Sequence, residues 1–291
     1  MKIRSCASSA NLGPGFDTLG IAWQCWNDID IEKAEGLSVT GCEERFRGPD
    51  NLVYRAYEAA MNYAGVSADG VAIRFSDCHI PVSRGLGSSS ALITAGVLGA
   101  NELNGLGLSR EELFSIAARL EGHPDNVAPA LFGGFTAAAT VAGESRYVSF
   151  SVSEKLYFTA LIPDFELSTA LSRSVLPADY PRVDAVFNLS RLPFLIRALE
   201  TGDRELLRLG LQDRIHQSYR LPLIRGYDKA ESLVKVCGGA ELCISGAGST
   251  LLCVAENAEF SGRLAAAAKE ELPGWQVRPL LPDMKGVRVI G

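Results

Sequence analysis

Strands interleaved with helices in two blocks of this 291-residue chain predict two mixed α/β domains that meet near residues 150–160. A chain of this length can bury a sizeable core in one large domain or two ordinary ones. In the first block, residues 71–75 alternate apolar and polar side chains as a half-buried strand does, and helices are expected over 50–65, 88–104 and 108–122. In the second block, strands are expected at 147–152, 156–162, 240–245, 249–255 and 275–280, and helices at 182–199, 203–217, 226–237 and 257–271.

Both ends of two helices can be assigned from local chemistry. Asp50 is the expected N-cap of the first helix, and Gly65 stands where that helix should stop. Ser109 and Glu112 have the spacing of a capping box, and Gly122 follows the last apolar position of the same helix. These signals make residues 108–122 the best-defined helix of the first block.

The segment 127–143 carries no charge and is the one candidate for a membrane span. It is short for a span, is rich in alanine, glycine and threonine, and contains Pro129 and the pair Gly133–Gly134. Two buried strands around the glycine pair are the better interpretation. The N-terminus lacks the apolar stretch of a signal peptide, and the seven cysteines contain no C-x-x-C pair, so we expect a cytoplasmic protein with reduced, mostly buried thiols.

The charge balance limits the kinds of ligand. The formal net charge is −6 and no run rich in lysine or arginine occurs, which argues against a nucleic-acid partner. A polyanionic ligand would therefore have to be bound by a few local groups: backbone amides, helix ends, a metal or single arginines.

The stretch "PVSRGLGSSSALI" at residues 81–93 suggests such an anion site made of backbone amides. Gly85 and Gly87 lack the Cβ atoms that would keep a ligand from the backbone, and the free amides of a following helix favour an anion. A simple turn capped by Ser88 explains the same residues. The chain lacks both the lysine-containing nucleotide-binding loop and the glycine-rich dinucleotide-binding motif. This stretch alone therefore does not distinguish an anion site from a capped turn.

Two further glycine-rich segments carry small polar residues: "ASSANLGPGFDTLGIA" (7–22) and "ISGAGSTLLCV" (244–254). With the 81–93 stretch between them, the set resembles the GHMP kinases, a family of small-molecule kinases, over essentially the whole chain. The resemblance implies an α+β, two-domain GHMP kinase fold, with a ribosomal-protein-S5-domain-2-like N-terminal domain (1–155) and a ferredoxin-like C-terminal domain (156–291). It also implies an ATP-binding loop made of Pro81, Gly85, Leu86, Gly87, Ser88 and Ser89, with Arg84 and Ser90 beside it. Arg84 either helps to hold phosphates or faces solvent.

The segments "SSANLGPGFDTLG" and "EGHPDNVAPALFGG" are most similar to the branch of that family that phosphorylates the side-chain hydroxyl of L-homoserine. A free amino acid presents a carboxylate, which suits arginine, and an ammonium group, which suits a carboxylate or amide. By the resemblance, Arg173 and Arg220 bind the substrate carboxylate, while Asn11 and Asp17 hold its ammonium and hydroxyl end. The remaining substrate contacts that the resemblance implies are Thr169, His123 and Gly246.

The resemblance also implies a Mg²⁺ ion held by Ser89 and Glu121, whose oxygens suit that cation. Asp125 and Asn126 occupy the neighbourhood in which some family members keep a general base, and Arg173 is the further candidate for a catalytic role. Two alternatives stay open: another GHMP kinase, acting on mevalonate or shikimate, and a non-catalytic binding protein on the same scaffold. A homodimer is expected from the family, and neither a nucleic-acid nor a membrane partner is expected.

Overall fold

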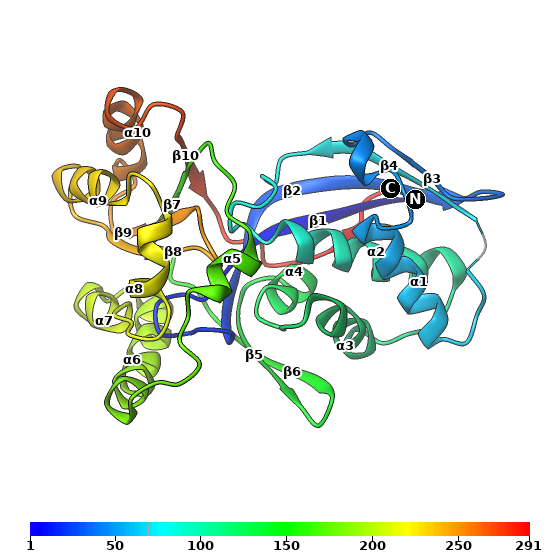
Figure 1. Ribbon diagram of the computed structural model, residues 1–291, viewed down its shortest axis with the longest axis horizontal. Helices are drawn as coiled ribbons and strands as arrows, with labels where there is room; N and C mark the ends of the chain where they lie inside the picture. The colour runs from blue at the N-terminus through cyan, green and yellow to red at the C-terminus, as the bar shows by residue number, and fades with distance from the viewer. Residues whose placement is uncertain (69) are drawn as a thin grey trace.

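The protein contains two β-sheets, each packed against helices (Figure 1). This computed structural model describes residues 1–68 and 70–291. The first half contains β1 (Lys2–Ala10), β2 (Leu19–Lys33), β3 (Ser38–Thr40), η1 (Glu44–Phe46), α1 (Leu52–Tyr63), β4 (Val71–Cys78), α2 (Ser88–Asn104), α3 (Arg110–Glu121), α4 (Val127–Phe132), β5 (Phe135–Val141) and β6 (Glu144–Phe150). The second half contains β7 (Tyr157–Ile162), α5 (Thr169–Ser174), α6 (Arg182–Thr201), α7 (Arg204–Gly210), α8 (Gln217–Arg220), η2 (Leu221–Leu223), α9 (Tyr227–Val236), β8 (Glu241–Ile244), β9 (Leu251–Ala255), α10 (Phe260–Glu271), β10 (Gln276–Leu280) and β11 (Arg288–Val289).

The first sheet has the strand order β11-β1-β2-β4-β3, and β5 adds to β2 and pairs with β6. Its pairings are antiparallel apart from β3 with β4, which run parallel. The helices α1 to α4 gather at this half of the molecule, and their apolar side chains share one core with the sheet (Figure 1). The strand expected at 71–75 is confirmed as the first part of β4, with the alternating burial that its pattern predicts.

The second sheet has the order β10-β7-β9-β8 and is antiparallel throughout. Helix α9 precedes β8 and α10 joins β9 to β10, so the elements follow the βαββαβ order of a ferredoxin-like fold. Side chains of β7 alternate between two cores: Phe158 and Ala160 pack with α6 and α7, while Leu161 packs with α9 and α10. This arrangement confirms the expected fold class.

The two halves are joined by a shared core and by the C-terminal strand. Trp23 of β2 packs on Phe158 of β7 with ring centroids 5.0 Å apart. The final strand β11 leaves the second half and pairs with β1, and both termini lie together at the first sheet (Figure 1). The expected C-terminal domain covers 156–291, but β11 at its end belongs to the first sheet.

The predicted helix ends are partly confirmed. The capping box of Ser109 and Glu112 is formed, and Gly122 ends α3 in the left-handed region. The N-cap of α1 is Asn51 and not Asp50, because the Asn51 side chain accepts hydrogen bonds from the amides of Val53 and Tyr54. Asp50 therefore precedes the helix without capping it.

Two other predictions were wrong. Residues 127–132 form the helix α4 and not a strand, since Pro129 lies in the first turn, where a missing N–H breaks no intrahelical bond. The helix expected over 203–217 is interrupted after Gly210, and the chain turns before α8. Asp213 stabilises that turn by accepting hydrogen bonds from the amides of Ile215, His216 and Gln217.

The cysteines are free thiols, as expected, and five of the seven are buried; Cys42 is half-buried and Cys78 is exposed. Over residues 1–68 and 70–291, no helix combines the length and the apolar character that crossing a bilayer requires.

Candidate functional site

The three glycine-rich segments meet at the start of α2. The first segment bonds to the second through the Ser8 amide, which donates to the Leu86 carbonyl at 3.1 Å. The third segment bonds to the second through the Ser245 hydroxyl, which donates to the Gly85 carbonyl at 2.6 Å. The first and third segments are bonded to each other by the Gly246 amide, which donates to the Ala10 carbonyl at 2.9 Å. Residues 78 or more positions apart in sequence are therefore bonded into one unit.

Close packing explains why the second segment needs its glycines. Gly85 has a φ of +76°, and a Cβ atom there would lie 2.3 Å from the carbonyl oxygen of Ser245. Gly87 has a φ of +65°, and its Cβ would lie 2.0 Å from the Ser8 hydroxyl. The sequence suggested that these glycines make room for a ligand; in the structure they also make room for the other two segments.

The amides of residues 85–89 are available to a ligand. Gly87 is the N-cap of α2, and Ser88 is its first helical residue, so the alternative of a Ser88 cap is wrong. Among the described residues, none accepts a hydrogen bond from the amides of 85–89. Free amides and the positive end of a 17-residue helix together favour an anion at this point.

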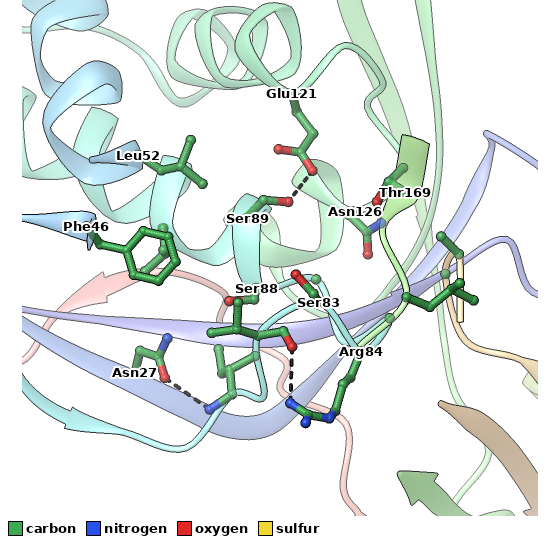
Figure 2. A pocket seen from close by; sticks show the side chains of 18 of the residues that line it. Asn27, Phe46, Leu52, Ser83, Arg84, Ser88, Ser89, Glu121, Asn126 and Thr169 are labelled. Carbon is green, nitrogen blue, oxygen red and sulfur yellow. Dashed lines mark hydrogen bonds between the residues drawn. The ribbon is translucent and has the colours of Figure 1, made fainter. Parts of the chain in front are cut away.

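A cavity of about 640 Å³ opens over this loop. Figure 2 shows Ser88 and Ser89, at the start of α2, between Glu121 on one side and Asn27 with Phe46 on the other. The predicted site residues that line the cavity are Asn11, Arg84, Gly85, Gly87, Ser88, Ser89, Glu121, His123, Asn126, Thr169, Arg173, Arg220 and Gly246. Pro81, Leu86, Ser90, Asp17 and Asp125 are not part of the lining.

Arg84 is engaged by the protein itself. Its guanidinium group donates to the carbonyls of Pro163 at 3.0 Å and Asp164 at 2.8 Å, just beyond β7. A further bond at 3.3 Å reaches the Val82 carbonyl (Figure 2). Arg84 thus ties the loop to the second sheet, a role that neither sequence alternative included.

A hydroxyl and carboxylate cluster lies at the first turn of α2. The Ser89 hydroxyl donates to Glu121 Oε1 at 2.5 Å, and the Ser90 hydroxyl donates to the same oxygen at 3.1 Å (Figure 2). Ser90 is fully buried and supports Glu121 from behind. In the part of the chain that the structure describes, no group of three or more His, Cys, Asp or Glu residues is arranged to hold a metal. A cation here would rest on one carboxylate, one hydroxyl and a ligand's own oxygens, which is the donor set that Mg²⁺ commonly uses.

Opposite charges are paired at the other wall. The Arg173 guanidinium donates to both carboxylate oxygens of Asp17, at 2.7 and 3.1 Å. Burial alone would lower the pKa of Arg173, but the hydrogen bonds and charge of Asp17 outweigh it and raise that pKa. Asn11 holds the loop that carries Asp17, because its side chain accepts from the Asp17 amide at 2.8 Å and donates to the Gly246 carbonyl at 3.0 Å.

Arg220 is fully buried beside this pair. It donates to the carbonyls of Ser172 at 3.1 Å and Gly246 at 3.2 Å, and its Nη1 lies 3.4 Å from His216 Nδ1. Because His216 Nε2 donates to the Gly13 carbonyl at 2.8 Å, its Nδ1 is the acceptor, and burial lowers the pKa of this imidazole. Burial, followed by repulsion from Arg173, also lowers the pKa of Arg220. His216 was missed from the sequence, since nothing local marks it as a partner of Arg220.

The segment after α3 supplies a second group of polar side chains. His123 Nδ1 lies 3.1 Å from the carboxylate of Asp125, and this hydrogen bond raises the pKa of His123, against the effect of burial. Asp125 is 1% exposed and also accepts from the Asn126 amide at 2.9 Å. The Asn126 side chain accepts from the Ser8 hydroxyl at 2.9 Å. Asp125 therefore acts on its neighbours from outside the cavity, whereas His123 and Asn126 face it.

The end of the cavity farthest from Arg173 carries mainly apolar side chains, which no motif in the sequence predicts. Its walls come from η1, the start of α1, β4 and the segment after β4, and include Phe46, Leu52, Phe75, Ile80 and Val82. Such a slot suits a flat, aromatic part of a ligand. Its residues are scattered singly along the sequence, so no motif could reveal them.

Comparisons with known proteins agree with this geometry. Residues 51–134 match the family model described as the GHMP kinases N terminal domain. The chain is 39% identical to a homoserine kinase of Clostridium kluyveri over 100% of this chain and 98% of that protein, and 38% identical to a homoserine kinase of Clostridium beijerinckii over 99% and 98%. A crystal structure of homoserine kinase from Cytophaga hutchinsonii superposes with a TM-score of 0.87 at 28% identity, covering 100% of this chain and 97% of that one. The L. major mevalonate kinase shares the fold, with a TM-score of 0.72 at 18% identity over 98% and 97% of the two chains.

Proposed function

The chain belongs to the homoserine kinases of the GHMP kinase family, and we propose that it transfers the γ-phosphate of ATP to the side-chain hydroxyl of L-homoserine. The product, O-phospho-L-homoserine, is the precursor of threonine. The observation that carries the proposal is that one cavity is lined by a loop with free amides, by the Ser89–Glu121 cluster and by two arginines, of which Arg173 pairs with Asp17 behind the lining. A cytoplasmic location and a homodimer remain predictions.

The triphosphate of ATP would lie on the amides of residues 85–89, and the base would occupy the apolar end of the cavity. The local amides and helix dipole support this placement in a chain with a net charge of −6, because they act over a few ångströms and need no basic patch.

Mg²⁺ would be held by Ser89 and Glu121, whose oxygens already converge. When bound with ATP, the ion would neutralise part of the charge on the phosphates. Ser90 keeps the carboxylate of Glu121 in place, which prepares the site before any cation arrives.

L-homoserine is zwitterionic, and the Asp17–Arg173 pair offers a complement to both of its charges. The substrate ammonium would replace Arg173 at Asp17, while the substrate carboxylate would replace Asp17 at Arg173. Arg220 adds a second cation to the carboxylate side, and Asn11, Thr169, His123 and Gly246 line the same part of the cavity. A non-ionic alcohol such as galactose would leave both charged groups without a new partner.

Phosphoryl transfer depends more on positioning and charge neutralisation than on covalent help from the protein. Asp125 is buried behind His123, which supports a positioning role for it rather than direct removal of the hydroxyl proton. Asn126 faces the cavity and is fixed by Ser8, so it can orient the hydroxyl or a phosphate oxygen. Arg173 would be the catalytic cation through its hold on the substrate.

The test is ADP release with Mg²⁺ and ATP against L-homoserine, L-threonine, mevalonate, shikimate and galactose. We expect turnover with L-homoserine and phosphorylation of its side-chain oxygen by ³¹P NMR. Turnover only with a substrate that is not an amino acid would refute the assignment. Nucleotide binding without turnover of any acceptor would indicate a binding protein.

A further inference from the structure

One buried amide in the cavity has a free donor. Asn27 lies on β2 with 4% of its surface exposed. Its Oδ1 accepts from the backbone amides of His79 at 3.0 Å and Ile80 at 3.1 Å. An NH₂ group cannot accept these bonds, so the orientation of the side-chain amide is fixed and Nδ2 is the atom left over.

Asn27 Nδ2 is directed into the cavity. It has no hydrogen-bond partner among residues 1–68 and 70–291, and Asn27 is part of the cavity lining. Figure 2 shows this nitrogen on the side of Asn27 that faces Phe46, with the oxygen turned toward the segment after β4. Because this donor opens onto the cavity and is held in place by the two bonds of Oδ1, a ligand that brings an acceptor to this point gains a hydrogen bond without reorienting the side chain.

The surroundings define what kind of acceptor can reach it. The walls beside Asn27 are apolar, and the nearby amide of Asn51 is already used, because it caps α1 and donates to the Phe46 carbonyl at 2.8 Å. The slot therefore offers apolar walls and one fixed amide donor, with the acidic side chains of Glu43 and Asp50 also in the lining.

We propose that Asn27 reads the purine base of the nucleotide by donating a hydrogen bond from Nδ2 to an unprotonated ring nitrogen. This inference rests on the proposed function, since it takes the apolar slot as the base site. Adenine carries lone pairs at N1, N3 and N7, whereas a ring position that bears hydrogen would face Asn27 donor to donor. A bond to N1 would distinguish adenine from guanine, which carries hydrogen there, whereas a bond to N3 or N7 would recognise purines in general. Asn27 thus determines the base preference, and the loop before α2 supplies the binding that does not depend on the base.

The test needs no variant at first. ATP and its 1-deaza, 3-deaza and 7-deaza analogues each differ by one ring nitrogen, and their binding to the wild-type protein can be measured by calorimetry without an acceptor. We expect one analogue to bind about 5- to 100-fold more weakly than ATP, and the other two to bind within about twofold of it. Equal binding of all four nucleotides would overturn the proposal.

Asn27→Asp then identifies the residue that responds to that nitrogen. The aspartate keeps an oxygen for the two backbone amides but presents an acceptor in place of the donor. We expect ATP to lose at least the same factor, because the new acceptor faces a lone pair, and the sensitive analogue to lose clearly less than ATP does, because it has no lone pair at that position. Losses that multiply would exclude Asn27 as the partner.

The matched control is Asn62→Asp, which makes the same chemical change on the exposed side of α1. It should leave all four nucleotide affinities unchanged. Inorganic tripolyphosphate should bind equally to the wild type and Asn27→Asp. Failure of the proposed function is distinguishable: a protein that binds the nucleotides but does not phosphorylate homoserine refutes the activity, whereas an active kinase indifferent to the deaza series refutes only the role of Asn27.

Discussion

Replacing Gly85 by alanine should destabilise the protein and weaken the proposed ATP binding together, because the loop before α2 and the third glycine segment share a contact there. The residue has a φ of +76°, and its carbonyl accepts from the Ser245 hydroxyl at 2.6 Å. A methyl group at this position meets backbone atoms of the third segment and cannot turn away from them.

The magnitude has two parts. An L-residue in the left-handed region costs about 1–2 kcal/mol. The added Cβ would lie 2.3 Å from the Ser245 oxygen and 2.7 Å from the Gly248 oxygen, both backbone, and relieving such overpacking costs about 1–3 kcal/mol more. We therefore expect a total loss of about 2–5 kcal/mol in the free energy of unfolding.

Gly105→Ala separates the two parts. Gly105 ends the same helix α2 with a φ of +61°, but nothing lies within 4 Å of its ideal Cβ position. It should lose only the conformational part, about 1–2 kcal/mol, and keep its ATP affinity. Urea denaturation gives the stabilities, and calorimetry gives the ATP dissociation constants. Equal destabilisation by the two variants, or unchanged ATP binding in Gly85→Ala, would refute the packing argument.

Three other predictions concern the polar walls. Asp125→Asn should slow turnover by less than about 100-fold, the low end of a general-base contribution, and a larger loss with binding intact would make Asp125 the base. Arg173→Lys should raise the KM for L-homoserine about 10-fold or more and leave the KM for ATP nearly unchanged, because a lysine cannot reproduce the two-pronged contact seen with Asp17; steady-state kinetics would show equal effects on both substrates if this is wrong. The raised pKa of His123 means that its pairing with Asp125 stabilises the fold fully below about pH 6.5 and fades as the pH rises through the folded-state pKa. The stability difference between the wild type and Asp125→Asn should accordingly shrink from pH 6 to pH 9 in thermal melts, and a constant difference would contradict it.

The helices that could be predicted are those whose ends are set by local groups. The capping box of Ser109 and Glu112 and the stop at Gly122 act within a few residues, so the sequence defines α3 almost completely. The range 127–143 failed for the opposite reason. An uncharged sequence rich in alanine and glycine shows no hydrophobic periodicity from which helix and strand could be distinguished. Its first part is a helix because it packs against the first sheet in that form.

Long-range pairing was also beyond the sequence. The strand β11 has only two residues, and its pairing with β1 bridges almost the whole chain. The turn after Gly210 depends on Asp213, whose side chain also accepts from Asn188 in α6 at 2.6 Å. A helical pattern across 203–217 contains no sign of that contact.

At the candidate site, the motifs predicted the loop with free amides and the charged residues, but not the residues that hold them in place. Glu121 and Ser89 are 32 residues apart and come together as expected, at 2.5 Å. Arg84 was left open between phosphate and solvent, and its real partners, the carbonyls after β7, belong to a segment with no motif. Phe46 and Asn27 line the cavity from elements that are ordinary in sequence, so only the folded arrangement identifies them.

The first and third glycine segments orient the backbone amides of the second. In a planar peptide unit the C=O and the following N–H point in opposite directions, so fixing an oxygen aims the next amide. The carbonyls of Arg84, Gly85 and Leu86 are bound by the Thr250 amide, the Ser245 hydroxyl and the Ser8 amide, at 3.1, 2.6 and 3.1 Å. The amides of the next residue in each case are thereby aimed away from the first and third segments before any ligand arrives. The proposed binding of a triphosphate by an acidic chain without a loop lysine would then need little reordering of the loop, because the loop is ordered on folding rather than on binding.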